Sequence, residues 1–162
     1  MMMLRMGKLA DYATVIMTYM ACEPELVVNA QKVASAIGIE LPTVSKILKM
    51  LTQGKLLRSQ RGSKGGYTLA RTPNEISVAE IIDIMEGHPM GLTECSSSPG
   101  LCARESVCAI RGNWQQISQT IREVLGRITL VELSRPALQN KNIDAGPVQK
   151  KAAEFQEIYV EG

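Results

Sequence analysis

Two short amphipathic segments separated by a tight turn constrain the fold of this 162-residue chain more than any other feature. Asn29 is a favourable N-cap for a helix over residues 30–37, and Gly38 is suited to ending that helix. Pro42 fits the first turn of a second helix over residues 42–53, because the N–H that it lacks has no partner there. Two short helices joined by a four-residue connection predict a helix-turn-helix.

The segment that follows predicts a small β-hairpin. Leu56 and Leu57, and then Tyr67 and Leu69, have the character of two short strands, and the Gly-rich run RGSKGG lies between them. A helix-turn-helix followed by a basic hairpin is a winged helix. We therefore expect a mainly α fold with a small β-wing.

Two further helices are predicted around this motif. Apolar residues recur at helical spacing over residues 7–22, and Ser77 and Glu80 form a capping box for a helix that ends at Gly87. Aromatic residues make up only 4% of the chain, so aliphatic and Met side chains must fill the core. Residues 1–87 are predicted to form a winged helix-turn-helix DNA-binding domain.

A long helix is predicted over about residues 104–133. Its apolar side chains alternate by four and three residues, which is a heptad seam. Because so long a helix has little of its own domain to pack on, we expect it to pair with a second copy of the chain. Residues 134–162 are more polar and are predicted to be a flexible C-terminal tail. The seam consists of Ile110, Trp114, Ile117, Ile121, Val124, Ile128 and Val131.

Positive charge is concentrated in the first half of the chain. Residues 1–72 contain ten Lys and Arg against four Asp and Glu, although the whole chain carries a net charge of only +2. A basic region of this kind suits a polyanion, so we expect double-stranded DNA as a partner. A winged helix places the second helix of its motif and its wing against DNA. The candidate DNA-binding residues there are Thr43, Ser45, Lys46, Lys49, Arg58, Arg61, Gly62, Lys64 and Gly65.

Membrane and enzyme functions are not expected. No apolar run approaches the roughly 18–20 residues that span a bilayer, and no signal-peptide cleavage motif follows the first apolar stretch. We therefore expect a cytoplasmic protein. The chain has a single His, His88, and no C-x-x-C motif, so it offers no evident nucleophile–base pair.

Three of the four cysteines, Cys95, Cys102 and Cys108, lie within fourteen residues of one another. The fourth, Cys22, is interpreted as a small buried apolar residue at the end of the first helix. An odd number of thiols argues against disulfides, and structural zinc usually needs shorter paired spacings than these. The spacing favours an iron–sulfur cluster held by a loop over residues 88–109, with zinc and reactive thiols as the alternatives.

Three thiols leave room for a fourth ligand. His88 lies seven residues before Cys95, and Asp11 lies on the predicted first helix. The residues alone do not choose between them.

The sequence resembles the winged-helix iron–sulfur regulators typified by IscR and NsrR. The resemblance is carried by LADYATVIMTYMA, LPTVSKILKML, QRGSKGGYTLA, ISVAEIIDIMEG and the three-cysteine loop, which together cover residues 4 to about 133. The run LTECSSSPGLCARESVCAIRGNWQQI is most similar to repressors of the SUF cluster-assembly operon. The resemblance implies a cytoplasmic homodimer that binds a palindromic operator and represses iron–sulfur cluster assembly genes.

The resemblance also implies a ligand set in which Cys95, Cys102 and Cys108 hold the cluster. Where IscR has a His ligand three residues after the last cysteine, this sequence has Arg111. The Asp that NsrR supplies from the first helix of the other subunit is matched by Asp11, so we expect Asp11 from the partner subunit. This set favours [4Fe–4S] over [2Fe–2S]. The alternative is a nitric-oxide- or redox-sensing, zinc-bound or thiol-based repressor of the same architecture.

Overall fold

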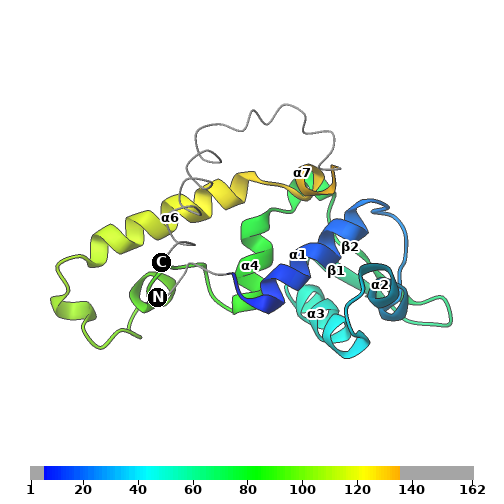
Figure 1. Ribbon diagram of the computed structural model, residues 1–162, viewed down its shortest axis with the longest axis horizontal. Coiled ribbons are helices and arrows are strands. Elements are labelled where there is room, and N and C mark those ends of the chain that lie inside the picture. The colour runs from blue at the N-terminus through cyan, green and yellow to red at the C-terminus, as the bar shows by residue number, and fades with distance from the viewer. Residues whose placement is uncertain (1–5, 136–162) are drawn as a thin grey trace, which may run out of the picture.

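The computed structural model describes residues 6–135, a mainly helical fold with one two-stranded antiparallel sheet. Figure 1 shows α1–α4 and the sheet at one end of the molecule, while α6 extends away from them toward the other end. No helix in this part of the chain is both long enough and apolar enough to cross a membrane. The elements are α1 (Lys8–Ala21), α2 (Ala30–Ile37), α3 (Leu41–Gln53), β1 (Leu57–Gln60), β2 (Gly66–Leu69), η1 (Pro73–Glu75), α4 (Val78–Glu86), α5 (Glu94–Ser97), η2 (Glu105–Val107), α6 (Arg111–Arg127) and α7 (Leu130–Ser134).

The predicted helix-turn-helix is confirmed as α2 and α3. The side chain of Asn29 accepts a hydrogen bond from the backbone N–H of Lys32 at 2.8 Å, which caps α2. Gly38 ends α2 with a φ of 70°, a backbone conformation that glycine adopts without a steric penalty. Pro42 lies in the first turn of α3. Local residue choices therefore fix both ends of the turn.

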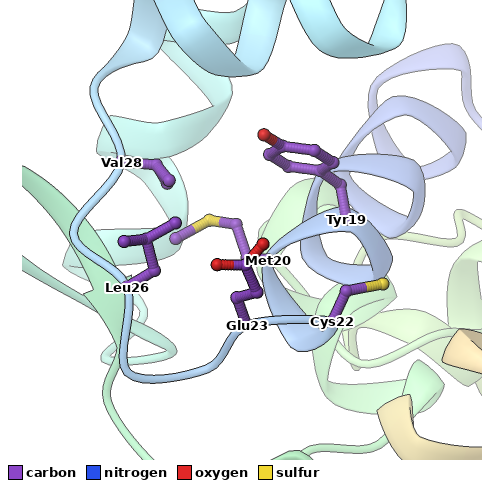
Figure 2. A pocket seen from close by; sticks show the side chains of 6 residues that line it. All are labelled: Tyr19, Met20, Cys22, Glu23, Leu26 and Val28. Carbon is purple, nitrogen blue, oxygen red and sulfur yellow. The ribbon is translucent and has the colours of Figure 1, made fainter.

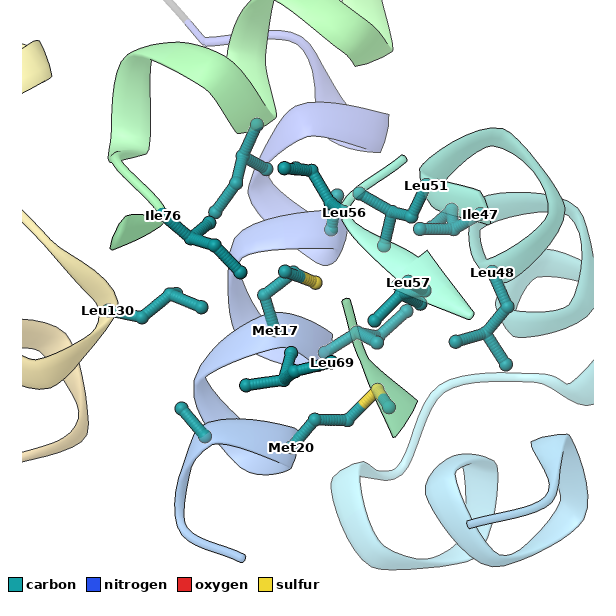
Figure 3. Close-up of a cluster of buried hydrophobic side chains, with 14 of the residues drawn as sticks. Met17, Met20, Ile47, Leu48, Leu51, Leu56, Leu57, Leu69, Ile76 and Leu130 are labelled. Atoms are coloured by element: carbon teal, nitrogen blue, oxygen red, sulfur yellow. The ribbon is translucent and has the colours of Figure 1, made fainter. Parts of the chain in front are cut away.

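Aliphatic and Met side chains form one hydrophobic core, as the low aromatic content predicts. Figure 3 shows that helices, both strands and the segment around Ile76 contribute to it, and that Leu130 enters it from α7. Full burial of each such side chain contributes about 1.5–3 kcal/mol to folding. The largest fully buried side chains are Ile16, Met17, Ile47, Leu48, Leu51, Leu56, Ile76, Ile81 and Leu130.

The wing is tied to the connection between α1 and α2. The strands pair with Leu57 opposite Leu69, and Val28 adds a bridge beside β2. The N–H of Val28 donates to the carbonyl of Tyr67 at 3.0 Å, and the N–H of Tyr67 donates to that of Val28 at 2.8 Å. A Cβ atom at Gly66 would lie 2.5 Å from the Val28 carbonyl oxygen, so this close approach requires glycine.

Helix α4 has the predicted start and end. The hydroxyl of Ser77 accepts from the N–H of Glu80 at 3.3 Å, and the carboxylate of Glu80 accepts from the N–H of Ser77 at 3.0 Å. Arg71 also donates to that carboxylate at 2.6 Å. Burial raises the pKa of Glu80, but the hydrogen bonds from Arg71 and Ser77 outweigh it and hold this pKa below its usual value.

The long helix predicted over residues 104–133 is wrong in extent, because α6 covers only Arg111–Arg127. On its N-terminal side, η2 and an extended Cys108 replace helix. On its C-terminal side, the carbonyl of Ile128 accepts from the N–H of Val78 at 2.9 Å, and the N–H of Leu130 donates to Ile76 at 3.0 Å. Thr129 and Glu132 then cap α7. Pairing with the segment before α4 therefore ends the heptad seam.

The outer face of α6 is apolar and exposed in the single chain. Ile110, Ile117 and Val124 are 55%, 44% and 54% exposed, while Trp114 and Ile121 are half-buried. The predicted tail over residues 134–162 lies outside the described residues from residue 136 onward.

Candidate DNA interface and cysteine segment

Helix α3 separates an apolar face from a polar one. Val44, Ile47, Leu48 and Leu51 are buried, as predicted for the inward face. On the other side, Lys46 and Lys49 are exposed and Thr43 and Ser45 are half-buried. A helix that buries one face and presents short polar and basic side chains on the other can enter the major groove of DNA.

The wing presents the second set of predicted cations. Arg58 on β1 and Arg61 and Lys64 at the hairpin tip are all exposed. Gly62 has a φ of 121°, and a Cβ atom at Gly65 would lie 2.5 Å from the Gln60 carbonyl oxygen. The tip is therefore a glycine-dependent turn whose bare backbone can approach phosphate groups closely.

The cations of α3 and the wing are not neutralised within residues 6–135. The ion pairs of this part of the chain join Arg71 to Glu80, Arg111 to Glu105 and Arg122 to Asp83, each at 2.6 Å. None of these pairs involves a residue of α3 or of the hairpin. Five side-chain charges on one pair of adjacent elements thus remain available to a polyanion, namely Lys46, Lys49, Arg58, Arg61 and Lys64.

Cys95 is buried on α5 and is held by hydrogen bonds. The hydroxyl of Thr93 lies 3.3 Å from the Cys95 sulfur. The amide of Gln115 donates to the Cys95 carbonyl at 3.3 Å. The predicted loop over residues 88–109 thus contains a short helix on which Cys95 is buried.

Ser118 attaches α5 to α6. It is 2% exposed and is the buried residue of α6. Its hydroxyl accepts from the N–H of Leu92 at 3.0 Å and donates to the hydroxyl of Ser96 at 3.0 Å. The turn that carries Cys95 is thus fixed to α6 through polar contacts.

Cys102 and Cys108 are half-buried and lie on either side of η2. Glu105, between them, accepts from the N–H of Gly100 at 2.6 Å and pairs with Arg111 at 2.6 Å. These contacts fold the segment between Gly100 and Arg111 on itself.

The predicted ligands do not converge in one chain. Three thiols are suitable donors for iron or zinc, but no three His, Cys, Asp or Glu side chains within residues 6–135 lie close enough together to hold a metal ion. Asp11 is exposed on α1, and a ring nitrogen of His88 lies 3.1 Å from the carbonyl oxygen of Pro89. As arranged here, the residues of a single described chain do not fit a cluster.

Cys22 is exposed, so the prediction that it is a buried apolar residue is wrong. It follows the last residue of α1, and its thiol lies 3.5 Å from the carbonyl oxygen of Thr18. Figure 2 shows it at the edge of a small pocket that Met20, Leu26 and Val28 also line.

Sequence reasoning missed the polar contacts that hold α6. Arg122 donates to Asp83 on α4, and Ser118 bonds to Leu92 and Ser96. The partners lie 22 to 39 residues apart in the chain. No local pattern signals such pairs.

Comparisons with known proteins place these elements in a family. Residues 6–136 match the family model "Rrf2: Iron-dependent Transcriptional regulator". A predicted HTH-type transcriptional regulator of Mycobacterium tuberculosis is 32% identical over 136 residues, which is 83% of this chain and 84% of that protein. The HTH-type transcriptional regulator IscR of Xenorhabdus nematophila is 33% identical over 96 residues, covering 59% of this chain and 57% of the relative.

Solved structures agree on the fold. The structure of T. potens IscR has a TM-score of 0.59 and 29% identity, covering 80% of this chain and 85% of that one. CymR of B. subtilis, described as the global cysteine regulator, has a TM-score of 0.62 and 24% identity, covering 82% and 97%. These proteins are transcriptional regulators rather than enzymes, in agreement with the sequence prediction. By its match over residues 6–136, this chain belongs to the Rrf2 family of transcriptional regulators, whose winged helix is a DNA-binding fold.

Proposed function

We propose that the protein binds a palindromic DNA operator as a homodimer and represses transcription there. The observation that carries this proposal is the set of exposed cations on α3 and the wing, which have no ion-pair partner within residues 6–135. Lys46 and Lys49 would lie in the major groove, and Arg58, Arg61 and Lys64 would contact the flanking phosphates. Thr43, Ser45, Gly62 and Gly65 would contribute short side chains and backbone to the same contacts.

The exposed apolar face of α6 supports the homodimer. Ile110, Ile117 and Val124 follow one another at a spacing of seven residues and are about half exposed in the single chain. Seven-residue spacing lets two helices bury the same face against each other about a two-fold axis. A two-fold dimer presents two recognition helices, which matches two half-sites of a palindrome.

The first experiment removes Lys46 and Arg61 together, as Lys46→Ala/Arg61→Ala. Wild-type protein first selects its duplex from a random-sequence DNA pool, and affinity for that duplex is then measured against salt concentration. Loss of the two Arg61–phosphate contacts per dimer should lower the slope of log affinity against log salt by about 1.8, and loss of Lys46 from the major groove should lower the affinity further. Arg104→Ala/Arg127→Ala removes the same charge from exposed sites outside α3 and the wing and should leave the slope unchanged. An unaltered slope in the first variant would contradict the interface.

We also propose that Cys95, Cys102 and Cys108 bind an iron–sulfur cluster, [4Fe–4S] rather than [2Fe–2S], with Asp11 of the partner subunit as fourth ligand. The thiol spacing and the similarity to IscR support this proposal. Since the three thiols do not lie together in the described chain, binding requires the cysteine segment to rearrange. The related proposal for the target is that the regulated genes are those of iron–sulfur cluster assembly, in keeping with the SUF-like cysteine segment.

The cluster proposal is tested on protein purified without oxygen. Wild type should contain iron and sulfide and absorb visible light, and Cys102→Ser should lose both this absorbance and the cluster-dependent part of its operator affinity. Cys22→Ser is the matched control, because Cys22 lies at the far end of α1 from the cysteine segment and should retain the colour. A colourless wild type that responds to oxidants would instead favour the thiol-based alternative, which the separated thiols support.

A further inference from the structure

Asp83 on α4 is bonded to two other parts of the molecule at once. One carboxylate oxygen, Oδ2, accepts from Nε and Nη2 of Arg122 on α6 at 3.0 and 2.6 Å. The other, Oδ1, accepts from the backbone N–H of Met90 at 2.7 Å, where the chain turns toward the cysteine segment. The Asp83 side chain is only 17% exposed. One side chain thus joins the winged helix to α6 and to the start of the cysteine segment.

These bonds matter because α6 has little apolar packing to orient it. Its buried residue is Ser118, its apolar residues Ile117 and Val124 are about half exposed, and Leu125 is the residue of α6 that packs against the core. A guanidinium that donates two N–H groups to one carboxylate fixes angle as well as distance. The hydrogen bonds that Arg122 donates to Asp83 raise the pKa of Arg122, which keeps this guanidinium ionised. The orientation of α6 relative to α4 therefore depends on the ion pair between Asp83 and Arg122.

A small change in the orientation of α6 would displace the recognition helices α3 by a distance that matters for DNA binding. Helix α6 has 17 residues and is about 25 Å long. A tilt of about 8° moves one end of a helix of this length by about 3.4 Å relative to the other end, which is the rise of one base pair. In a dimer formed through α6, the same tilt changes the separation of the two α3 helices.

We propose that Asp83 is a positioning residue for operator recognition, which through Arg122 fixes the separation of the two recognition helices. This inference rests on the proposed DNA-binding dimer. It assigns Asp83 and Arg122 a role in selecting half-site spacing rather than in contacting DNA.

The test uses a set of duplexes derived from the one that wild-type protein selects. The separation of the half-sites is changed one base pair at a time, and the dissociation constant is measured for each duplex. Wild type should prefer the selected spacing by about tenfold over its neighbours, the effect of one lost base contact. Asp83→Ala and Arg122→Ala should reduce this preference to about threefold or less. The double variant should be no worse than either single one, because both remove the same contact.

Arg71→Ala is the matched control. It removes the ion pair between Arg71 and Glu80 of α4, which is 2.6 Å long like that between Arg122 and Asp83 but does not involve α6. It should retain the wild-type spacing preference. Sedimentation and thermal unfolding check that each variant remains folded and dimeric, and Arg122→Ala decides the matter if Asp83→Ala does not fold.

Wild-type spacing preference in a folded, dimeric Arg122→Ala protein would overturn the role of Asp83 while leaving the DNA-binding proposal intact. A wild type that selects no duplex, or that is monomeric, would overturn the proposed function itself and this inference with it.

Discussion

Replacing Ile117 by Ala should weaken the dimer without disturbing the monomer. Ile117 lies in the middle of α6 and is 44% exposed in the single chain. Ala has a higher helix propensity than Ile, so the substitution does not destabilise α6 itself. The change therefore isolates the apolar contact that a second copy would make.

The size of the effect follows from the exposed fraction. Full burial of an Ile side chain contributes about 1.5–3 kcal/mol, so covering the exposed 44% contributes about 0.7–1.3 kcal/mol for each copy. A two-fold interface contains the residue twice, which gives about 1.3–2.6 kcal/mol for the dimer. The dissociation constant of the dimer should then rise by about ten- to eightyfold.

Sedimentation equilibrium over a range of protein concentrations measures this constant. Leu26→Ala is the control, since Leu26 is 38% exposed and lies on the connection between α1 and α2 rather than on α6. It removes a similar apolar area and should leave dimerisation unchanged. The reasoning is refuted if Ile117→Ala dimerises as tightly as wild type, or if both substitutions weaken the dimer equally.

Three further predictions concern stability, measured by urea unfolding. Leu130→Ala should cost about 2–5 kcal/mol, because Leu130 is fully buried in the core. Gly66→Ala should cost about 1–3 kcal/mol, since its Cβ would meet the Val28 carbonyl oxygen at 2.5 Å; equal stability would contradict the contact. Glu80→Gln should be less stable than wild type at neutral pH. Because the pKa of Glu80 is lowered in the folded state, this difference should disappear as the pH falls below about 4; a difference that persists in acid would exclude the ionised carboxylate as its source.

The elements that local chemistry determines could be predicted from the sequence. Asn29, Gly38 and Pro42 each act on the backbone beside them, and the two helices of the motif lie where these residues indicate. The capping box at Ser77 is local in the same way. The wing required only its glycine-rich turn and the apolar residues that flank it.

Contacts between distant segments could not be predicted in this way. The heptad seam continues through Ile128 in the sequence, but Ile128 has an extended backbone whose carbonyl accepts a hydrogen bond from the N–H of Val78. The pattern of side chains does not reveal competition from a backbone segment about fifty residues earlier. Cys22 illustrates the same limit, since its position at the end of α1 did not show which way it faces.

The residues of the candidate site also differ in whether local sequence or distant contacts determine their exposure. The exposure of Lys46 and Arg61 follows from helical periodicity and from a hairpin tip, both of which are local. The burial of Cys95 depends on Gln115 and on the contact between α5 and α6, which only the folded chain brings together.

After α6 the chain returns to the winged helix, so that α6 and the winged helix form one folding unit. A fragment that ends at Gly87 would lack Leu130 and would leave a hole beside Ile76 at its own centre. Chimeras that join this winged helix to the α6 segment of another protein should therefore retain residues 128–134 of this chain. Chimeras that lack these residues should be insoluble.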